Sequence, residues 1–313
     1  MEHRLDARTK PGIDYDAVCR RIDALAGRGW EKRLVTEADG YPVFMLERKA
    51  SPREGRARPS LLIDAGIHGE EPAGVLGLLD WLEKSAEQWA PAIDFTVFPC
   101  LNPWGIERGL RFDPRGRDLN REFNNPVHPA VASFCRAVSD RRFDLFMDLH
   151  EDCDFFGMYL YEVAEPKASG LDGEGSGPSG ADSFTPDRTA AGRASSRRAP
   201  GRPTLGRAIL DTCRRLVPLS DGDDVGGITT RNGMVAGSLT RDEIEAWDQW
   251  PIALYAFVKH TDHVVTVETP GKQPLELRRT LHGIALDIAC RRLVEGSPTA
   301  KAPARNASHE GGS

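Results

Sequence analysis

The stretch Asp64-Ala65-Gly66-Ile67-His68-Gly69-Glu70-Glu71-Pro72 is the part of the sequence that decides the fold. An apolar run over 61–63 precedes it, and apolar residues at helical spacing follow Pro72, which suits the first turn of a helix. The stretch is therefore predicted to join a buried strand to an amphipathic helix. In open α/β folds, the loops at the carboxyl ends of strands carry the chemistry. Here His68 and Glu71 stand three positions apart, and zinc accepts an imidazole and a carboxylate together.

Composition restricts the class of protein before any further motif is considered. The chain has 313 residues, of which 40% are hydrophobic, so it can build a sizeable core. Its net charge is −6 and no basic stripe is visible, which argues against nucleic acid as a partner. No stretch resembles a secretion signal or reaches the length of a membrane span, so no membrane partner is expected. Six cysteines without a C-x-x-C pair indicate free thiols and a cytoplasmic protein.

The alternation of strands and helices predicts the fold class. Four apolar runs have the length of buried strands, and five segments with helical periodicity lie between or after them. This alternation implies an α/β fold in three α/β/α layers, with a mixed, mostly parallel central sheet. The predicted strands cover 60–65, 95–99, 143–149 and 263–269, and the predicted helices cover 72–89, 129–139, 205–217, 251–259 and 275–293.

Two segments differ in composition from the rest of the chain. The segment 165–203 is rich in Gly, Ser, Ala, Pro and Arg, and only Leu171 and Phe184 in it are large and apolar. Such a composition buries too little surface to offset the entropy of ordering, so a disordered insertion is predicted there and a similar tail over 296–313. The parts 1–164 and 204–295 are then predicted to form a single domain.

Polar residues follow three of the four predicted strands. His68 and Glu71 follow the first strand, and His150 directly after the third supplies a second imidazole. Two histidines, one glutamate and an open position make up one type of catalytic zinc site. Glu268 ends the fourth strand, where a carboxylate can take a proton from the attacking water and pass it to a leaving amine. The alternative for Glu268 is a structural acid paired with an arginine.

The loop between the second and third of these strands is rich in arginine. Arg111 and Arg121 lie there with Asn120, and a forked guanidinium matches a carboxylate through two parallel hydrogen bonds. The loop therefore suits a substrate with a free α-carboxylate. Arg115 and Arg117 are instead expected to be solvated charges of a surface turn.

The order and local sequence of these elements resemble the zinc metallocarboxypeptidases of the carboxypeptidase A type. The resemblance covers most of the chain that is predicted to be ordered. The matching elements are His68-Gly69-Glu70-Glu71, Asn102-Pro103-Trp104-Gly105, Arg111, Asp118-Leu119-Asn120-Arg121, His150 and Glu268.

The resemblance implies a metal site and its surroundings. It implies one zinc ion per chain, held by His68, Glu71 and His150, with Glu268 as the general base. Asp118 would accept a hydrogen bond from the ligating imidazole of His68 and so orient it, which is how such ligands are commonly fixed.

The resemblance also implies how a substrate would be held. Arg111 would polarise the scissile carbonyl and stabilise the oxyanion, while Asn120 and Arg121 would bind the terminal carboxylate. The expected reaction is hydrolysis of an amide bond next to a free C-terminal carboxylate in a peptide or a peptide-like substrate.

Two features depart from the digestive carboxypeptidases. The interval between Glu71 and His150 is shorter, and is closer to that of the succinylglutamate desuccinylases and aspartoacylases, which remove an N-acyl group from an amino acid. The tyrosine that covers the bound substrate has no clear match, and Tyr159, Tyr161 and Tyr255 are the candidates. An N-acyl amino acid deacylase is therefore the alternative function. A non-catalytic binding module built on a decayed enzyme is a third hypothesis.

The sequence leaves side-chain specificity and oligomeric state open. The specificity pocket is expected between Ile228 and Tyr255.

Overall fold

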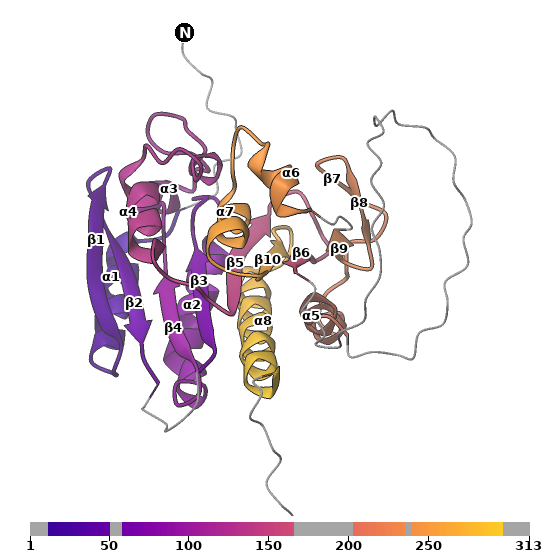
Figure 1. Ribbon diagram of the computed structural model, residues 1–313, viewed down its shortest axis with the longest axis horizontal. Helices are drawn as coiled ribbons and strands as arrows, with labels where there is room; N and C mark the ends of the chain where they lie inside the picture. Colours follow the sequence, from indigo (N-terminus) through magenta and orange to yellow (C-terminus); the bar gives the residue numbers. More distant parts are fainter. Residues whose placement is uncertain (1–11, 51–57, 166–202, 236–238, 297–313) are drawn as a thin grey trace, which may run out of the picture.

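A ten-stranded sheet lies at the centre of the computed structural model, which describes residues 12–50, 58–165, 203–235 and 239–296 (Figure 1). The strands are β1 (Glu31–Ala38), β2 (Tyr41–Arg48), β3 (Ser60–Ala65), β4 (Asp94–Phe98), β5 (Leu145–Asp152), β6 (Tyr159–Ala164), β7 (Asp224–Val225), β8 (Ile228–Arg231), β9 (Met234–Val235) and β10 (His263–Pro270).

The order of the strands places the longest parallel run in the middle of the sheet. Across the described residues the order is β1-β2-β4-β3-β5-β10-β6-β9-β8-β7. Strands β4, β3, β5 and β10 are parallel to one another, whereas β2 and β6 join this group antiparallel. The predicted mixed, mostly parallel sheet is confirmed.

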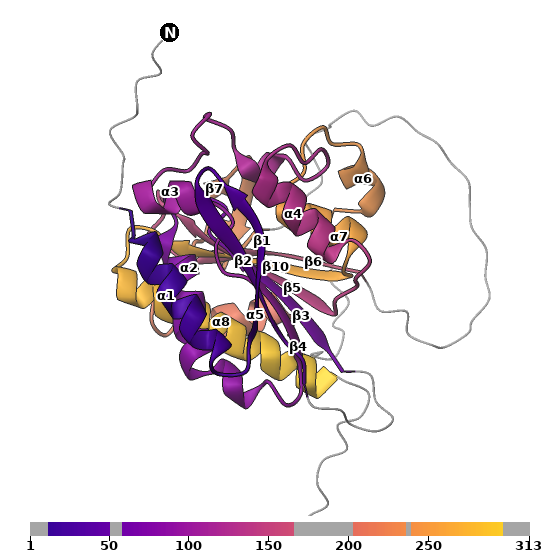
Figure 2. The same ribbon diagram turned by 90° about the vertical axis from the view of Figure 1, so that its left-hand side faces the viewer.

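Helices cover both faces of this sheet, as Figure 2 shows. They are α1 (Tyr15–Ala26), α2 (Pro72–Lys84), α3 (Pro103–Arg108), α4 (Pro129–Val138), α5 (Leu205–Cys213), α6 (Arg241–Glu245), α7 (Ile252–Lys259) and α8 (Leu275–Gly296), with 3₁₀ turns η1 (Ala86–Gln88) and η2 (Leu119–Arg121). One hydrophobic core joins the sheet to α1, α2, α5 and α8, and a second core joins its other face to α4, α6 and α7. The predicted three-layer α/β/α fold is confirmed.

Most predicted elements occur with shifted ends. Strand β3 has its predicted bounds, but β5 begins at Leu145 and continues to Asp152, beyond the predicted end at 149. It continues because β10 pairs with it as far as that residue. His150 and Glu151 therefore lie inside a strand, where successive side chains point to opposite faces of the sheet.

Both predicted parts of the domain contribute strands to the same sheet. Strands β1 to β6 come from the part before the predicted insertion, and β7 to β10 come from the part after it. Strand β10 lies between β5 and β6, so the two parts interleave. The insertion 165–203 and the tail 296–313 lie outside the described residues, except for Glu165, Pro203 and Gly296.

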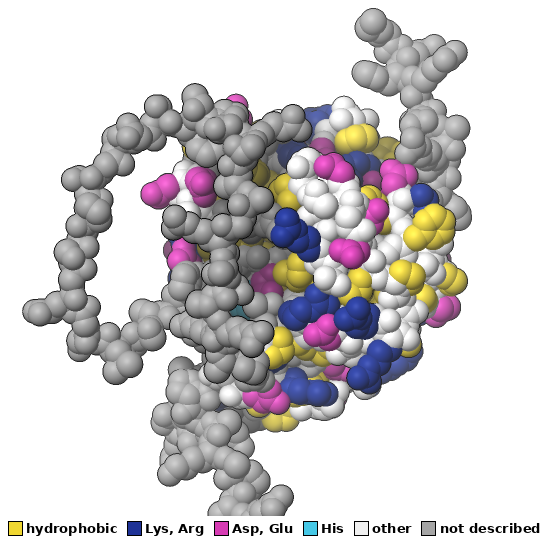
Figure 3. Space-filling model, turned by 90° about the vertical axis from the view of Figure 1, so that its right-hand side faces the viewer, with side chains coloured by type: hydrophobic (Ala, Val, Ile, Leu, Met, Phe, Trp, Pro, Cys, Tyr) yellow, Lys and Arg dark blue, Asp and Glu magenta, His cyan; other side chains and the backbone are white. Residues whose placement is uncertain are grey.

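The described surface carries charges of both signs. On the face shown in Figure 3, basic, acidic and hydrophobic side chains are interspersed. In the part of the chain that the structure describes, no helix is both long and apolar enough to cross a bilayer.

Glu162 on β6 fixes the first turn of α5 from outside the helix. Its carboxylate accepts hydrogen bonds from the backbone N–H groups of Leu205 (3.1 Å) and Gly206 (2.9 Å) and from His263 Nε2 (2.9 Å). Burial would raise the pKa of Glu162, but these hydrogen bonds outweigh it and hold the pKa below the ordinary 4.5. A carboxyl group with a lowered pKa in the folded state stabilises the fold above pH 4.5, and this contribution is lost as the pH falls through the lowered pKa.

We expect Glu162→Gln to lower the free energy of unfolding by roughly 2 kcal/mol at pH 7, because hydrogen bonds to a charged acceptor are lost. The difference from the wild-type chain should shrink as the pH falls below 4.5, where the wild-type carboxylate also becomes neutral. Urea unfolding at pH 7 and at successively lower pH measures both effects. A pH-independent difference would contradict this role, and Glu245→Gln, at an exposed ion pair with Lys259, is the control.

Candidate metal centre and substrate cavity

The polar cluster arises from the alternation of side chains on three adjacent parallel strands. Asp64 on β3 lies beside Asp148 on β5, and Asp148 lies beside Thr266 on β10. Two residues further along, His150 on β5 lies beside Glu268 on β10. The even spacing sends all of these side chains to the face covered by α4 and α7, whereas their apolar neighbours enter the core under α2 and α8.

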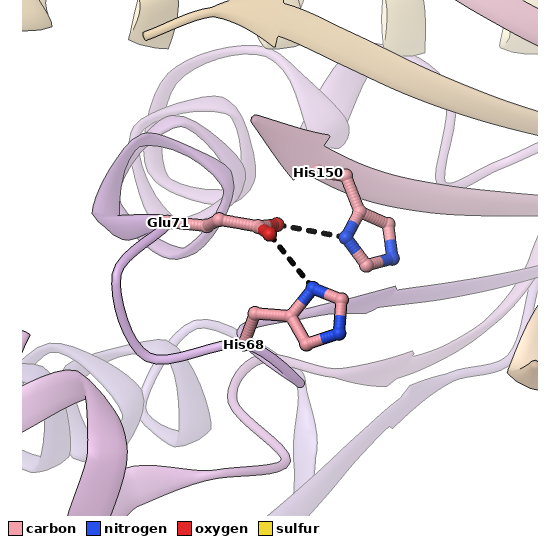
Figure 4. Close-up of side chains that lie close together, drawn as sticks. All are labelled: His68, Glu71 and His150. Carbon is pink, nitrogen blue, oxygen red and sulfur yellow. Dashed lines mark hydrogen bonds and ion pairs between the residues drawn. The ribbon is translucent and has the colours of Figure 1, made fainter. Parts of the chain in front are cut away.

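The loop from β3 to α2 brings the other two predicted ligands to this place. Gly66 begins the loop with a φ of 65°, in the left-handed region that favours glycine. His68 and Glu71 follow, and both are buried. The structure brings His68, Glu71 and His150 together, as the sequence predicts (Figure 4).

The Glu71 carboxylate lies between the two imidazoles. Its Oε1 is 2.7 Å from His68 Nδ1, and its Oε2 is 2.7 Å from His150 Nδ1. The backbone N–H of Glu151 also donates to Oε2 at 3.1 Å. Burial would raise the pKa of Glu71, but the two histidines outweigh it and hold the pKa far below the ordinary value.

The far nitrogen of each imidazole faces a second carboxylate. His68 Nε2 lies 3.2 Å from Asp118 Oδ1, and His150 Nε2 lies 2.9 Å from Asp148 Oδ1. Burial would lower the pKa of both histidines, but the neighbouring carboxylates outweigh it and raise both pKa values. Such carboxylate–imidazole pairs fix the ring orientation of metal-ligating histidines.

These residues fit a zinc ion by the chemistry of the donor set. One ligand atom from each of His68, Glu71 and His150 lies within 4.8 Å of the others. Nδ1 of each imidazole faces the Glu71 carboxylate at 2.7 Å, so the three ligand atoms converge on one place. Two imidazole nitrogens and one carboxylate oxygen match the ligands that zinc accepts. Asp118 and Asp148 orient the two imidazoles, and the backbone N–H of Glu151 orients the carboxylate.

Glu268 lies beside this cluster and faces the same cavity. Burial, together with the charges of Glu71, Asp152 and Asp148, raises its pKa well above the ordinary value, although His150 opposes the shift. Within the described residues no arginine forms an ion pair with Glu268, so its alternative role as a paired structural acid has no support there.

Arg111 is held by carboxylates on two sides. Its Nε and Nη2 donate to Asp118 Oδ2 at 3.2 and 3.1 Å, and its Nη1 lies 3.4 Å from Glu70 Oε1. Nη1 is also 3.7 Å from Glu71 Oε1. The guanidinium therefore has a fixed orientation, with one nitrogen directed toward the candidate metal ligands.

Asn120 and Arg121 present donors to the cavity. The backbone N–H of Ile252 donates to Asn120 Oδ1 at 2.8 Å, so the amide oxygen is used and the NH₂ group is turned the other way. Arg121 is exposed and donates to the backbone oxygen of Asn120 at 2.7 Å. Among the described residues, no carboxylate forms an ion pair with its guanidinium.

The cluster opens into a cavity of about 570 Å³. Its polar lining residues include the candidate ligands, Glu268 and two arginines, together with the carboxylates of Asp152, Asp154 and Glu162. Arg111 and Arg121 are the only arginine or lysine side chains among its described lining residues. The apolar wall of the cavity is formed by Val163, Val235, Leu239, Trp247, Leu254 and Val264.

Two loop arginines and three candidate tyrosines were also predicted, and they occupy different environments. Arg115 is exposed as expected, but Arg117 pairs with the buried carboxylate of Asp113 at 2.6 Å, so it is not simply a solvated charge. Of the three tyrosine candidates, Tyr161 lines the cavity, Tyr159 donates to Asp152 at 2.7 Å, and Tyr255 packs its ring against Phe123.

The sequence motifs indicate no role for Asp64, Glu70 or Asp148, and Glu151 is expected either to tune the neighbouring His150 or to hydrogen-bond a nearby loop. Asp148 was detectable, since it precedes His150 by two residues in a strand and so shares its face. Asp64 is buried beside it, and burial together with the Asp148 charge raises the pKa of Asp64 well above its ordinary value. Glu70 and Glu151 depend on contacts with residues distant in sequence, which no local pattern reveals.

Comparisons with known proteins agree with this geometry. The catalytic domain of the succinylglutamate desuccinylase/aspartoacylase family matches residues 57–169. Carboxypeptidase SOL1 of Arabidopsis thaliana is 26% identical over 125 residues, which are 37% of this chain and 24% of that protein. The match thus spans about a quarter of the length of that relative.

Solved structures share the fold across nearly the whole chain. A protein from Shewanella amazonensis has a TM-score of 0.66 at 21% identity, covering 90% of this chain and 93% of that one. A metallo-carboxypeptidase from Burkholderia cenocepacia has a TM-score of 0.60 at 15% identity, covering 91% and 70%. Carboxypeptidase A from Helicoverpa armigera has a TM-score of 0.59 at 12% identity, covering 93% and 75%.

These matches confirm the resemblance predicted from the motifs. Over residues 57–169 the chain is similar to the succinylglutamate desuccinylase/aspartoacylase catalytic domain, and it shares its fold with solved metallocarboxypeptidases.

Proposed function

We propose that this chain is a zinc-dependent metallocarboxypeptidase that removes an apolar residue from the free C-terminus of a peptide or peptide-like substrate. One observation carries the proposal. A buried cluster of two histidines and a glutamate opens into a cavity that is also lined by an apolar wall and by Arg121, which forms no ion pair with a described carboxylate. The cavity thus offers partners for a carboxylate, a scissile amide and an apolar side chain.

The metal would be held by His68 Nδ1, His150 Nδ1 and the carboxylate of Glu71. When bound, zinc polarises the scissile carbonyl and makes a water molecule acidic enough to lose its proton near neutral pH. Asp118 and Asp148 accept from the far nitrogens of the imidazoles and so keep the near nitrogens aimed at the cluster.

Glu268 would move the proton. Its carboxylate lies next to His150 on the neighbouring strand and faces the cavity, where it can accept the proton of the attacking water and return it to the leaving amine. Its raised pKa suits both steps, because a group whose pKa lies nearer neutrality accepts and returns a proton more readily.

The two arginines would divide the negative charges of the substrate between them. Arg111, fixed by Asp118, directs Nη1 toward the ligand cluster and suits the oxyanion that develops on the carbonyl. Arg121 and the free NH₂ group of Asn120 suit the terminal carboxylate. With both cations assigned, no described lysine or arginine of the lining remains for an acidic side chain, and the apolar wall suits an apolar one.

An N-acyl amino acid deacylase is the second candidate, and the family match over residues 57–169 favours it. The same residues would then cleave an acyl amide next to the free carboxylate of a single amino acid. The apolar wall favours an apolar amino acid in either reaction, since an acidic side chain would find no further lysine or arginine among the described lining residues.

Metal analysis tests the cluster. We expect about one zinc ion per wild-type chain, and His68→Ala should weaken zinc binding by more than 100-fold, because loss of an outer partner alone costs roughly 10- to 100-fold. Competition with a chromophoric chelator measures the affinity. His263→Ala, which removes a carboxylate-paired histidine outside the cluster, should leave it unchanged. Unchanged zinc binding by His68→Ala would refute the proposed site.

Glu268→Gln tests the proton transfer. The substitution keeps the shape of the side chain but removes its basicity, so kcat should fall by roughly 10²- to 10⁴-fold while the zinc content stays at the wild-type level. Steady-state kinetics together with metal analysis separates the two effects. The base assignment is wrong if the variant retains zinc and turns over at a near-normal rate. Glu276→Gln on the exposed side of α8 is the control.

A substrate panel tests the reaction and its specificity. Peptides ending in leucine or phenylalanine should exceed peptides ending in aspartate by at least about tenfold in kcat/KM, because an acidic side chain would find no further lysine or arginine among the described lining residues. The same peptides with an amidated C-terminus should be poor substrates, since Arg121 would lose its carboxylate. Cleavage of N-acyl amino acids but not of peptides would select the deacylase instead.

A further inference from the structure

The first turn of α2 cannot be capped by the residue that precedes it. Glu71 occupies the N-cap position, and its side chain makes no hydrogen bond to the helix. The reason is that both carboxylate oxygens of Glu71 already accept from His68, His150 and the backbone of Glu151. The N–H groups of a first helical turn have no acceptor within the helix, so another part of the chain must provide a hydrogen-bond acceptor.

Glu151 supplies that partner from strand β5. Its Oε1 accepts from the backbone N–H of Ala73, the second residue of α2, at 2.5 Å. The strand alternation that turns His150 toward the metal cluster turns Glu151 toward α2 and α8. Glu151 thus contacts both the Glu71 carboxylate and the helix that follows it. Its backbone N–H donates to Glu71, and its side chain caps α2.

Arg278 on α8 holds the Glu151 side chain in place. Its Nη1 pairs with Glu151 Oε2, and the two side chains are 9% and 0% exposed. Removing either partner alone would leave a buried charge unpaired. The pair therefore fixes Glu151 against rotation and ties α8 to strand β5.

Two glycines bring α2 close enough for this contact. A Cβ at Gly74 would lie 2.7 Å from the backbone oxygen of Leu149, and a Cβ at Gly77 would lie 2.8 Å from that of Arg279. Any other residue at either position would push α2 away from β5 or from α8. The close packing of α2 on β5 and α8 thus supports the contact between Ala73 and Glu151, as the buried ion pair with Arg278 does.

We propose that Glu151, held by Arg278, is a positioning residue that caps α2 in place of Glu71 and thereby keeps the Glu71 carboxylate on the two histidines. Without this acceptor, the Glu71 carboxylate is the nearest group on the helix itself that can cap Ala73. It would then leave the histidines. The inference rests on the proposed metal site for its consequence, weaker zinc binding, but its structural part does not require the metal.

Two double variants separate capping from the buried ion pair. Glu151→Gln with Arg278→Met removes both charges but keeps an oxygen for the N–H of Ala73. Glu151→Met with Arg278→Met removes both charges and the acceptor, and apolar replacement of a buried ion pair is often neutral for stability. We expect the first variant to bind zinc within about threefold of wild type and the second 10- to 100-fold more weakly.

Crystal structures of the two metal-free variants give a readout that does not depend on zinc. The first should keep the 2.7 Å contacts from Glu71 to His68 and His150, and the second should lose at least one of them. Equal zinc affinities and unchanged Glu71 contacts in both variants would overturn the proposal. Absence of zinc binding by the wild-type chain would contradict the proposed function, while the crystal structures would still decide the capping role.

A matched control lies one residue away on α8. Arg279 pairs with Asp80 of α2 at 2.5 Å, so this pair also ties the two helices together but does not reach β5. Arg279→Met with Asp80→Asn should change stability without changing zinc affinity. Should the variant with two methionines not fold, Glu151→Asp keeps the charge but shortens the side chain by one methylene. Zinc affinity equal to wild type in Glu151→Asp would then overturn the proposal.

Discussion

The rest of the site depends on one constraint, which is that the Glu71 carboxylate is buried and has no water to solvate it. A buried carboxylate must be paired or hydrogen-bonded, and Glu71 finds its partners in two imidazoles and one backbone N–H. Glu71 and His68 lie in the loop after β3, whereas His150 and Glu151 lie on β5. The hydrogen bonds of Glu71 therefore connect this loop to β5. Asp118 and Asp148 in turn hold the two imidazoles from behind. The helix that Glu71 begins must then obtain its cap from another element.

The topology of the sheet makes this arrangement possible. Strands β3, β5 and β10 are far apart along the chain, but they are adjacent and parallel in the sheet, so their carboxyl ends meet at one edge. Because the strands are pleated, successive side chains point to opposite faces of the sheet. Polar residues at even spacing on β5 and β10 line the cavity, and the apolar residues between them enter the core. Only Glu151 is a charged exception on the apolar side of β5, and its pairing with Arg278 explains how it is tolerated there.

The sequence predicted the parts of this structure that are encoded locally. Strand β3, the start of α2 at Pro72 and the grouping of His68, Glu71 and His150 follow from a short motif and from the order of the strands. The hairpin of β1 and β2 and the strands β6 to β9 were not predicted, because their apolar patterns are short and their positions depend on pairing with distant strands. The end of β5 was placed too early for the same reason, since its last residues are polar and are extended by pairing with β10.

The charges in the cavity indicate how a substrate would be oriented. Arg111 lies next to the ligand cluster but shares its charge with Asp118 and Glu70, whereas Arg121 forms no ion pair with a described carboxylate. A permanent negative charge on a substrate gains more from the unpaired cation than from the neutralised one. The terminal carboxylate would therefore settle at Arg121. Arg111 would be left for charge that develops only during the reaction, which is the interaction that accelerates it.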